Sequence, residues 1–396
     1  MRLTLNKRAD CAELEHQSAL VYHSCMHGNQ NHQEFIPGLK LAEGFFHEEV
    51  LPILKAHYPS LQYSAALIGS GSEVLGFDTA MSVDHHWGPR VMLFLRADDF
   101  KSKRDDIRIA LSNELPATYL GYSTNFSEPN PEDNGVQVLQ PVASGPVNHR
   151  VEMYTLDGFF LSYMGIQIDR ELEPADWLTL PHQKLRSITA GRVFRDNLGL
   201  EEIRARFSWY PHDVWLYILA AAWARIGQEE HLMGRAGLAD DEISSAIIGA
   251  RLVRDIIRLA FLMERQYAPY AKWLGTAFAQ LESAERLAPA LTSTLHAVSW
   301  EQRESSLCLA YEILAQMHNE LGITEPVSTE VSQFWNRPFR VIGGDRFTKA
   351  IMQRIRDPQI VSLTQRRPIG SVDLWSDNTD LLEDESLRSC LVALYR

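Results

Sequence analysis

The sequence contains little cysteine and no long apolar run. Its four cysteines, Cys11, Cys25, Cys308 and Cys390, do not form a CxxC pair, which argues against a zinc ribbon and against a redox dithiol. No apolar segment is long enough to cross a bilayer. The first residues turn acidic before the apolar core of a signal peptide could form. These absences predict a reduced, cytoplasmic protein without a membrane partner.

Positive charge is also scarce. The 38 Lys and Arg residues stand against 51 Asp and Glu residues, and the formal net charge is −13. This charge argues against a broad electrostatic surface for DNA or RNA, so nucleic acid is not an expected partner. A phosphate-bearing small molecule remains compatible with it, because a few local cations or a bound metal reverse the field within one cleft.

The first part of the chain predicts a mixture of helix and strand. Apolar residues recur at helical spacing through residues 34–60, and Pro59 ends the pattern. Ser, Asn, Pro and Gly are frequent between residues 123 and 148, which predicts a loop or flap. Short apolar or alternating runs predict strands at 63–68, 91–95 and 149–156.

Long amphipathic helices replace the strands from about Glu171 onward. The clearest patterns cover residues 215–235 and 242–274, and the second breaks near Pro269. The tail, residues 371–396, contains an acidic stretch and is expected to form a solvated cover that ends in a short helix.

These patterns predict an α+β fold. A mixed sheet with flanking helices is expected in residues 1–165, and an α-helical bundle domain is expected in residues 166–396.

Familiar glycine-rich and catalytic motifs are absent after the first predicted strand. A P-loop needs Lys and Ser or Thr after its second glycine, but Phe77 and Asp78 follow Gly76. A dinucleotide fingerprint needs a glycine where Val74 stands. The sequence also lacks a nucleophile elbow at this turn and an HExxH motif.

What remains is Gly69-Ser70 after one strand and Ser82-x-Asp84-x-His86 before the next. A tight turn at a helix start offers backbone N–H groups to phosphate oxygens, and Ser70 adds a hydroxyl. Residues two apart on a strand share a face, so Asp84 and His86 are expected to reach one metal ion beside the phosphates. Mg²⁺ prefers oxygen ligands, which suits Asp84 better than a histidine.

The pattern of Gly-Ser, a spacer and Ser-x-Asp-x-acid before an apolar strand resembles the signature of polymerase-β-type nucleotidyltransferases. The longer stretch GSGSEVLGFDTAMSVDHHWGPR is similar to a branch of nucleotidyltransferase-like proteins with a helical C-terminal domain, similar in layout to aminoglycoside nucleotidyltransferases. The resemblance extends to FIPGLKLAEGFF, AGRVFRDNLG, YPHDVW and YAPYAKW, and so to most of the chain.

The resemblance implies a metal-dependent transfer of a nucleoside monophosphate from a nucleoside triphosphate to a hydroxyl group of a small molecule or protein. The implied cofactor is Mg²⁺ or Mn²⁺. The residues implied to bind the nucleotide are Gly69, Ser70, Ser82 and Lys272. The implied catalytic residues are Asp84 and Glu152, and the implied metal ligands are Asp84, His86 and Glu152.

His86 departs from the family pattern, because it stands where a second carboxylate is expected. Three interpretations follow: the imidazole ligates a metal, the second metal site is weakened, or the protein binds nucleotide as a regulatory module without turnover. Replacing His86 with Asp and measuring metal affinity would separate them.

Two further possibilities involve the helical region. Arg251 and Arg254 lie three apart on one helix face, where they either approach a triphosphate or form a solvated face with ion pairs. The Arg225-x5-His231 spacing allows a nuclease, although the acidic net charge disfavours RNA.

Overall fold

The computed structural model describes residues 34–133 and 135–396. Its main sheet has the strand order β5-β2-β1-β6. Strand β1 is antiparallel to β2 and β6, whereas β2 and β5 are parallel. The sheet is therefore mixed, as expected, and β1, β2 and β5 coincide with the predicted strand segments. The strands are β1 Tyr63–Leu67, β2 Arg90–Leu95, β5 Arg150–Tyr154 and β6 Arg192–Arg195.

The fourth strand, β6, comes from the region in which only helices were expected. Its residues Val193 and Arg192 pair with Ala66 and Leu67 of β1. The expectation that strands end before Glu171 is therefore wrong, and the sheet extends past residue 165. Its sequence Arg-Val-Phe-Arg neither alternates nor forms a long apolar run, so neither strand pattern marks it. The division into domains 1–165 and 166–396 stays a prediction.

Two hairpins complete the strands: β3 Thr118–Tyr119 with β4 Tyr122–Ser123, and β7 Ser332–Gln333 with β8 Arg340–Val341.

Helices flank the sheet and build the C-terminal region. The predicted helix at 34–60 is present as two α-helices joined by a π-helical turn, and the two long predicted helices are present as α10 and α11. No helix in the described part of the chain is long and apolar enough to span a membrane. The α-helices are α2 Gly38–Phe45, α3 Leu51–His57, α4 Ser72–Leu75, α5 Ala97–Glu114, α6 Leu156–Met164, α7 Pro174–Thr179, α8 His182–Thr189, α9 Leu200–Ala205, α10 His212–Leu238, α11 Glu242–Met263, α12 Leu274–Phe278, α13 Ala284–His296, α14 Trp300–Glu320, α15 Gly344–Met352, α16 Pro358–Thr364, α17 Val372–Trp375, α18 Thr379–Glu383 and α19 Arg388–Val392. The π-helical turn is η1 Phe46–Val50, and the 3₁₀ turns are η2 Ala80–Ser82, η3 Pro131–Asp133, η4 Ala271–Trp273, η5 Glu385–Leu387 and η6 Ala393–Tyr395.

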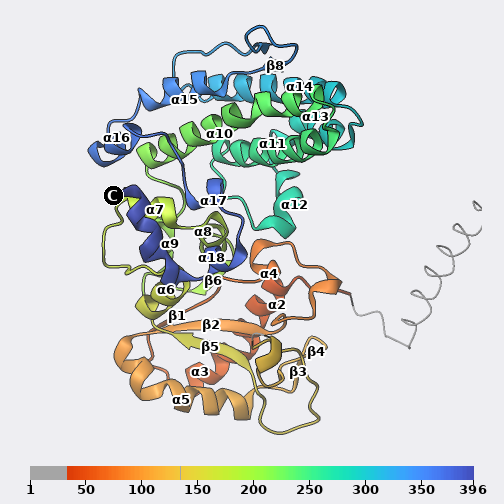
Figure 1. Cartoon of the computed structure of the whole chain (residues 1–396). Helices are drawn as coiled ribbons and strands as arrows, with labels where there is room; N and C mark the ends of the chain where they lie inside the picture. The colour runs from red at the N-terminus through yellow and green to blue at the C-terminus, as the bar shows by residue number, and fades with distance from the viewer. Residues whose placement is uncertain (1–33, 134) are drawn as a thin grey trace, which may run out of the picture. The chain divides into compact units, whose positions relative to one another are not determined.

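The sheet is covered on both faces. Every residue of β1 and β2 is buried, as the continuous apolar run of β2 predicts for a central strand. Ala66 and Phe94 belong to the large core that includes Phe160 of α6, whereas Leu67 packs with Ala42 of α2 on the other side. In Figure 1, α3 and α5 lie on one side of β2 and β5, and α6 and α8 lie on the other.

Helix α10 is the centre of the helical region. It is buried around its whole circumference over residues 214–224, which is typical of a helix surrounded by others. It packs against α11, α14 and α15. The indole ring of Trp223 stacks on Phe347 of α15 with a centroid distance of 4.0 Å.

The C-terminal tail, residues 371–396, covers the protein as expected, and most residues of its acidic stretch 374–386 are exposed, but contacts on either side of this stretch also anchor it. The Asp373 carboxylate accepts a hydrogen bond from the backbone N–H of His182 at 3.0 Å, and Arg388 pairs with Asp176 of α7 at 2.5 Å. The tail does end in short helices, as expected. Apolar residues of the tail also pack against the rest of the protein: Leu382, Val392 and Tyr395 are all buried.

Candidate functional site

The Gly69-Ser70 turn follows directly on β1. Gly69 is buried with a φ of +83°, and its N–H donates to the Ser187 carbonyl at 2.9 Å. Gly71 has a φ of +143°, and a Cβ atom there would lie 2.5 Å from Arg90 Nη2. Both the backbone conformation and the lack of space therefore require glycine at position 71. The turn leaves Ser70 exposed to solvent.

A buried ion pair fixes this turn to β2. Arg90, the first residue of β2, donates from Nη2 to the Ser70 carbonyl at 2.6 Å and from Nε to Glu73 at 2.8 Å. Arg90 is 6% exposed and Glu73 is 4% exposed. Burial opposes the charge of Arg90, but the neighbouring Glu73 holds the pKa of the guanidinium above its ordinary value. The Arg90 and Glu73 side chains thus hold the Gly69-Ser70 turn in place. Helix α4 has only four residues, so its dipole contributes little at this turn.

The two candidate serines have different surroundings. The Ser70 hydroxyl lies 3.4 Å from the Tyr163 hydroxyl and remains accessible. Ser82 closes the 3₁₀ turn η2, where its hydroxyl accepts a hydrogen bond from the Thr79 N–H at 3.0 Å. Ser82 therefore has a local capping role, and its contact with a nucleotide stays a prediction.

Asp84 and His86 do not lie on a strand. Residues 83–89 form bends before β2, and His86 has a φ of +55°. The alternation of a strand therefore does not apply, and the expectation that the two side chains share a strand face is wrong. The Asp84 side chain is 61% exposed and contacts His85 Nδ1 at 2.9 Å. Slight burial acts to raise the pKa of Asp84, but hydrogen bonding to His85 lowers this pKa below its ordinary value.

His86 contacts Arg150 of the neighbouring strand β5. A guanidinium nitrogen of Arg150 lies against Nδ1 of His86, and the His86 N–H donates to the Gln137 carbonyl at 2.8 Å. Burial and the positive charges of Arg150 and Arg90 lower the pKa of His86. The imidazole is therefore neutral at pH 7, with Nδ1 as the acceptor from the guanidinium.

Arg150 also holds Glu152. Its Nη2 donates to Glu152 Oε1 at 3.0 Å, while 33% of the Glu152 side chain is exposed. Arg150 is 9% exposed, and its Nε has no hydrogen-bond partner within the described residues. Arg150 and Arg90 are direct neighbours in the β2–β5 register. The structure thus brings Ser70, Arg90, His86, Arg150 and Glu152 together at one end of the sheet.

A guanidinium group lies among the expected metal ligands. Within residues 34–133 and 135–396, no three His, Cys, Asp or Glu side chains are placed to hold a metal ion. More directly, the Arg150 guanidinium contacts both His86 and Glu152, so a positive group already lies between two of the three expected ligands. Metal ligation by Asp84, His86 and Glu152 stays a prediction.

Lys272 lies in the 3₁₀ turn η4 and is exposed. Its Nζ lies 5.0 Å from the ring centroid of Trp273, and Trp273 packs against Phe77 of the loop after α4 with a centroid distance of 5.4 Å. The segment that carries Lys272 is therefore attached to the loop that follows the Gly69-Ser70 turn. A contact between Lys272 and a triphosphate stays a prediction.

Arg150 and Glu73 were missed by the sequence analysis. Arg150 did carry a signal, because it lies two residues before Glu152 and so shares its strand face. Glu73 gave no such signal in the sequence, because it meets its partner Arg90, 17 residues away, only when the turn has folded.

The pair that suggested a nuclease has other contacts. Arg225 forms ion pairs with Glu229 at 3.0 Å and with Asp255 at 3.4 Å. His231 stacks on Phe334 with a centroid distance of 4.7 Å. Both residues thus have neighbours that explain their positions without a catalytic role.

One family comparison is informative. Residues 177–274 match a family model described as "Domain of unknown function (DUF4037)". The matched region begins in α7 and ends at the start of α12, so it contains β6 and Lys272 but not the Gly69-Ser70 turn or β5. No curated protein and no solved structure matches the chain.

Proposed function

We propose that the Gly69-Ser70 turn and the adjoining ends of β2 and β5 bind the phosphate groups of a nucleoside triphosphate. The observation that carries the proposal is the buried Arg150, whose Nε is unpartnered among the described residues, next to an exposed serine turn. Arg90 links the two, because it holds the Ser70 carbonyl and neighbours Arg150 in the sheet.

Phosphate suits this set of groups. A guanidinium donates charge-assisted hydrogen bonds to phosphate oxygens, and these are stronger than hydrogen bonds between neutral groups. The exposed hydroxyl of Ser70 adds a donor at the edge of the same turn. Arg90 pairs with the buried Glu73, whereas Arg150 pairs with Glu152, whose side chain is 33% exposed, so Arg150 is the cation for which a phosphate would compete.

Binding without turnover is the form of the proposal that the geometry supports best. His86 occupies the second acid position of the family pattern, and its Nδ1 is engaged by Arg150. In such a site the bound nucleotide acts as a regulatory ligand, and no group is transferred. The resemblance to nucleotidyltransferases then describes the architecture of the site and not its activity.

Metal-dependent nucleotidyl transfer to a hydroxyl of a small molecule or protein is the second candidate. The exposure of Asp84 and Glu152 favours it, because both carboxylates remain accessible from solvent. Release of pyrophosphate on incubation with a nucleoside triphosphate and Mg²⁺ or Mn²⁺ would favour transfer over binding alone.

Calorimetric titration of the full chain with each nucleoside triphosphate tests the proposal. We expect binding of at least one triphosphate without added metal. Replacement of Arg150 with Gln is expected to weaken it roughly tenfold or more, because a charge-assisted contact is lost. The matched control is Arg286→Gln, which removes an arginine that is 40% exposed and paired with Glu320 on the helical region.

If none of the triphosphates binds, the proposal is rejected. Equal binding by the wild-type protein and Arg150→Gln would place the nucleotide elsewhere on the molecule. Far-ultraviolet circular dichroism of both variants establishes that loss of binding does not come from loss of the fold.

A further inference from the structure

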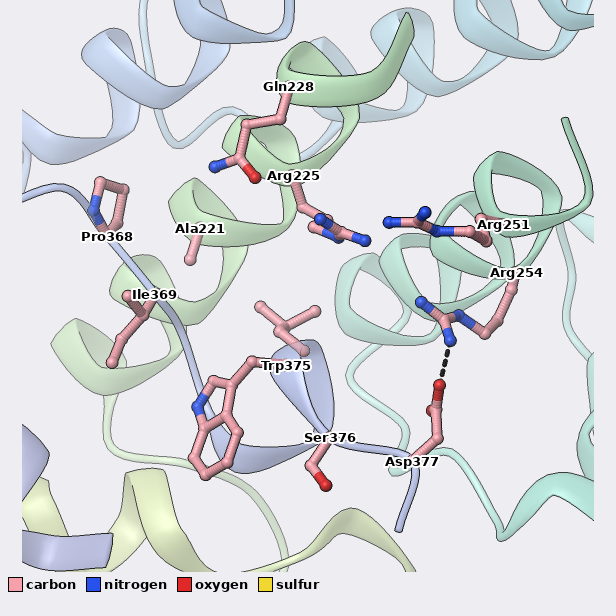
Figure 2. A pocket seen from close by; sticks show the side chains of 11 residues that line it. Ala221, Arg225, Gln228, Arg251, Arg254, Pro368, Ile369, Trp375, Ser376 and Asp377 are labelled. Atoms are coloured by element: carbon pink, nitrogen blue, oxygen red, sulfur yellow. Dashed lines mark hydrogen bonds and ion pairs between the residues drawn. The ribbon is translucent and has the colours of Figure 1, made fainter. Parts of the chain in front are cut away.

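A second site with suitable chemistry lies in the helical region. A cavity of about 350 Å³ opens between α10, α11 and the segment 368–377. This volume is within the range of small-molecule sites. Three arginines line it, Arg225 from α10 and Arg251 and Arg254 from α11. Figure 2 shows Arg225 and Arg251 pointing toward one another, and both contact Oε1 of Glu229.

Buried carboxylates hold these arginines in place. Glu229, which is 5% exposed, pairs with Arg225 at 3.0 Å and also contacts Arg251. Asp255, which is 3% exposed, pairs with Arg254 at 3.0 Å. Neither carboxylate lines the cavity. The guanidinium groups are therefore oriented by anions that lie outside the cavity wall.

The cavity wall itself is positively charged. The four arginines of this cluster, Arg225, Arg251, Arg254 and Arg258, outnumber its three carboxylates, Glu229, Asp255 and Asp377, so the cluster has a net charge of +1. Asp377 is already bound on two sides, by Arg254 and, at 2.7 Å, by Arg258. Arg225 Nε is buried and lies 3.4 Å from Asp255 Oδ2. An anionic group such as a phosphomonoester is therefore favoured over a cation at this wall.

The cavity also has a flat, partly apolar part of its wall. Trp375 of α17 lines the cavity together with Pro368 and Ile369, and 37% of it is exposed. Its indole N–H donates to the Tyr395 hydroxyl at 3.2 Å, and that hydroxyl donates to the Gly370 carbonyl at 2.7 Å. The indole is therefore held in one orientation, where it offers a face on which a planar ring can stack.

We propose that this cavity binds a small molecule in which a phosphate group is joined to a planar ring system. The phosphate lies between Arg225 and Arg251, and the ring lies against Trp375. This inference is independent of the proposed function, because the cavity is lined by none of the residues of the Gly69-Ser70 turn, β2 or β5.

Adenosine 5′-monophosphate (AMP) is a suitable probe, with adenosine and ribose 5-phosphate as its two halves. Calorimetric titration of the full chain is expected to show binding of AMP and weaker binding of each half. Arg251→Gln is expected to weaken AMP binding roughly ten- to hundredfold, because a charged hydrogen-bonding partner is removed. Trp375→Leu is expected to weaken AMP and adenosine while leaving ribose 5-phosphate nearly unchanged.

Arg286→Gln again serves as the matched control, because the side chains of Arg251 and Arg286 are 44% and 40% exposed and each pairs with a glutamate. Arg150→Gln distinguishes the two sites, because weaker AMP binding in this variant would assign that binding to the end of the sheet. AMP affinity that falls in Arg150→Gln but not in Arg251→Gln would overturn the inference. A crystal of the wild-type protein soaked with AMP gives an answer without any variant: AMP between Arg225 and Trp375 supports it, and AMP bound only elsewhere overturns it.

Discussion

At the scale of single residues, Arg150 controls the electrostatics of the candidate site. Its guanidinium is largely buried next to that of Arg90, and burial together with this positive neighbour lowers the pKa of Arg150. Glu152 offsets part of the charge, and His86 accepts a hydrogen bond without adding charge. An additional anion is therefore favoured at this point, whereas an additional cation is not.

Replacement of His86 with Asp is expected to change this preference. Asp tolerates the left-handed φ of +55° at this position better than most residues, so the backbone is expected to be retained. A new carboxylate close to Glu152 is expected to raise the affinity for Mn²⁺ on the order of tenfold, measured by calorimetry. His86→Asn is the matched control, since it keeps the shape and backbone tolerance of Asp without its charge. The same Mn²⁺ affinity in both variants would contradict a site weakened by His86.

At the scale of secondary-structure elements, the helical region depends on the packing around α10. Helix α14 contributes His318, which is fully buried, with its ring 5.0 Å from that of Phe347 on α15. The Nε2 atom of His318 lies 3.0 Å from the Thr324 hydroxyl. A titratable side chain at a helix interface makes the stability of that interface depend on pH.

Burial lowers the pKa of His318 from 6.5 to about 4. The unfolded chain therefore binds a proton at this residue more readily than the folded protein does. The contribution of His318 to stability is complete above its unfolded pKa and is lost as the pH falls toward 4. From pH 6.5 to 4, the free energy of unfolding is expected to fall by up to about 3 kcal/mol more in the wild type than in His318→Gln. Urea denaturation at several pH values measures this difference, and parallel pH profiles would rule it out.

At the scale of the described molecule, the C-terminal tail joins elements that are far apart in sequence. Lys184 of α8 donates to the carbonyls of Tyr163 at 2.8 Å and Glu383 at 2.6 Å. Arg388 of α19 pairs with the buried Asp176 of α7. The acidic tail is therefore part of the packed structure, and it also supplies Trp375 to the arginine-lined cavity.

Loss of Arg388 is expected to be costly. Arg388→Met leaves the buried Asp176 with only Arg170 as a charged partner, so the free energy of unfolding is expected to fall by about 3 kcal/mol, as measured by urea denaturation. Arg396→Met is the matched control in the same tail, because Arg396 is 69% exposed and lies 3.6 Å from an exposed Glu173 carboxylate. An exposed pair of this kind contributes at most about 1 kcal/mol. Comparable losses in the two variants would contradict the role of the buried pair.

Features encoded by neighbouring residues were predictable from the sequence. Short apolar or alternating runs located β1, β2 and β5, and apolar residues at helical spacing located the long helices α10 and α11. Glycine and serine in the pattern of a turn located the Gly69-Ser70 corner at the end of β1. These features are local, because hydrophobic period and turn chemistry act within a few residues along the chain.

Features that join distant residues were decided only by the tertiary structure. The pairing of β6 with β1, the contact of Arg150 with His86 and the cavity between α10, α11 and the tail all bring together segments that no local pattern connects. The backbone before β2 also bends where a strand was expected, which moved Asp84 and His86 off a common face. The sequence by itself determined which elements form and which side chains are available for chemistry. Strand order and helix packing decided which of those side chains meet, because long-range contacts depend on how whole elements bury their apolar faces.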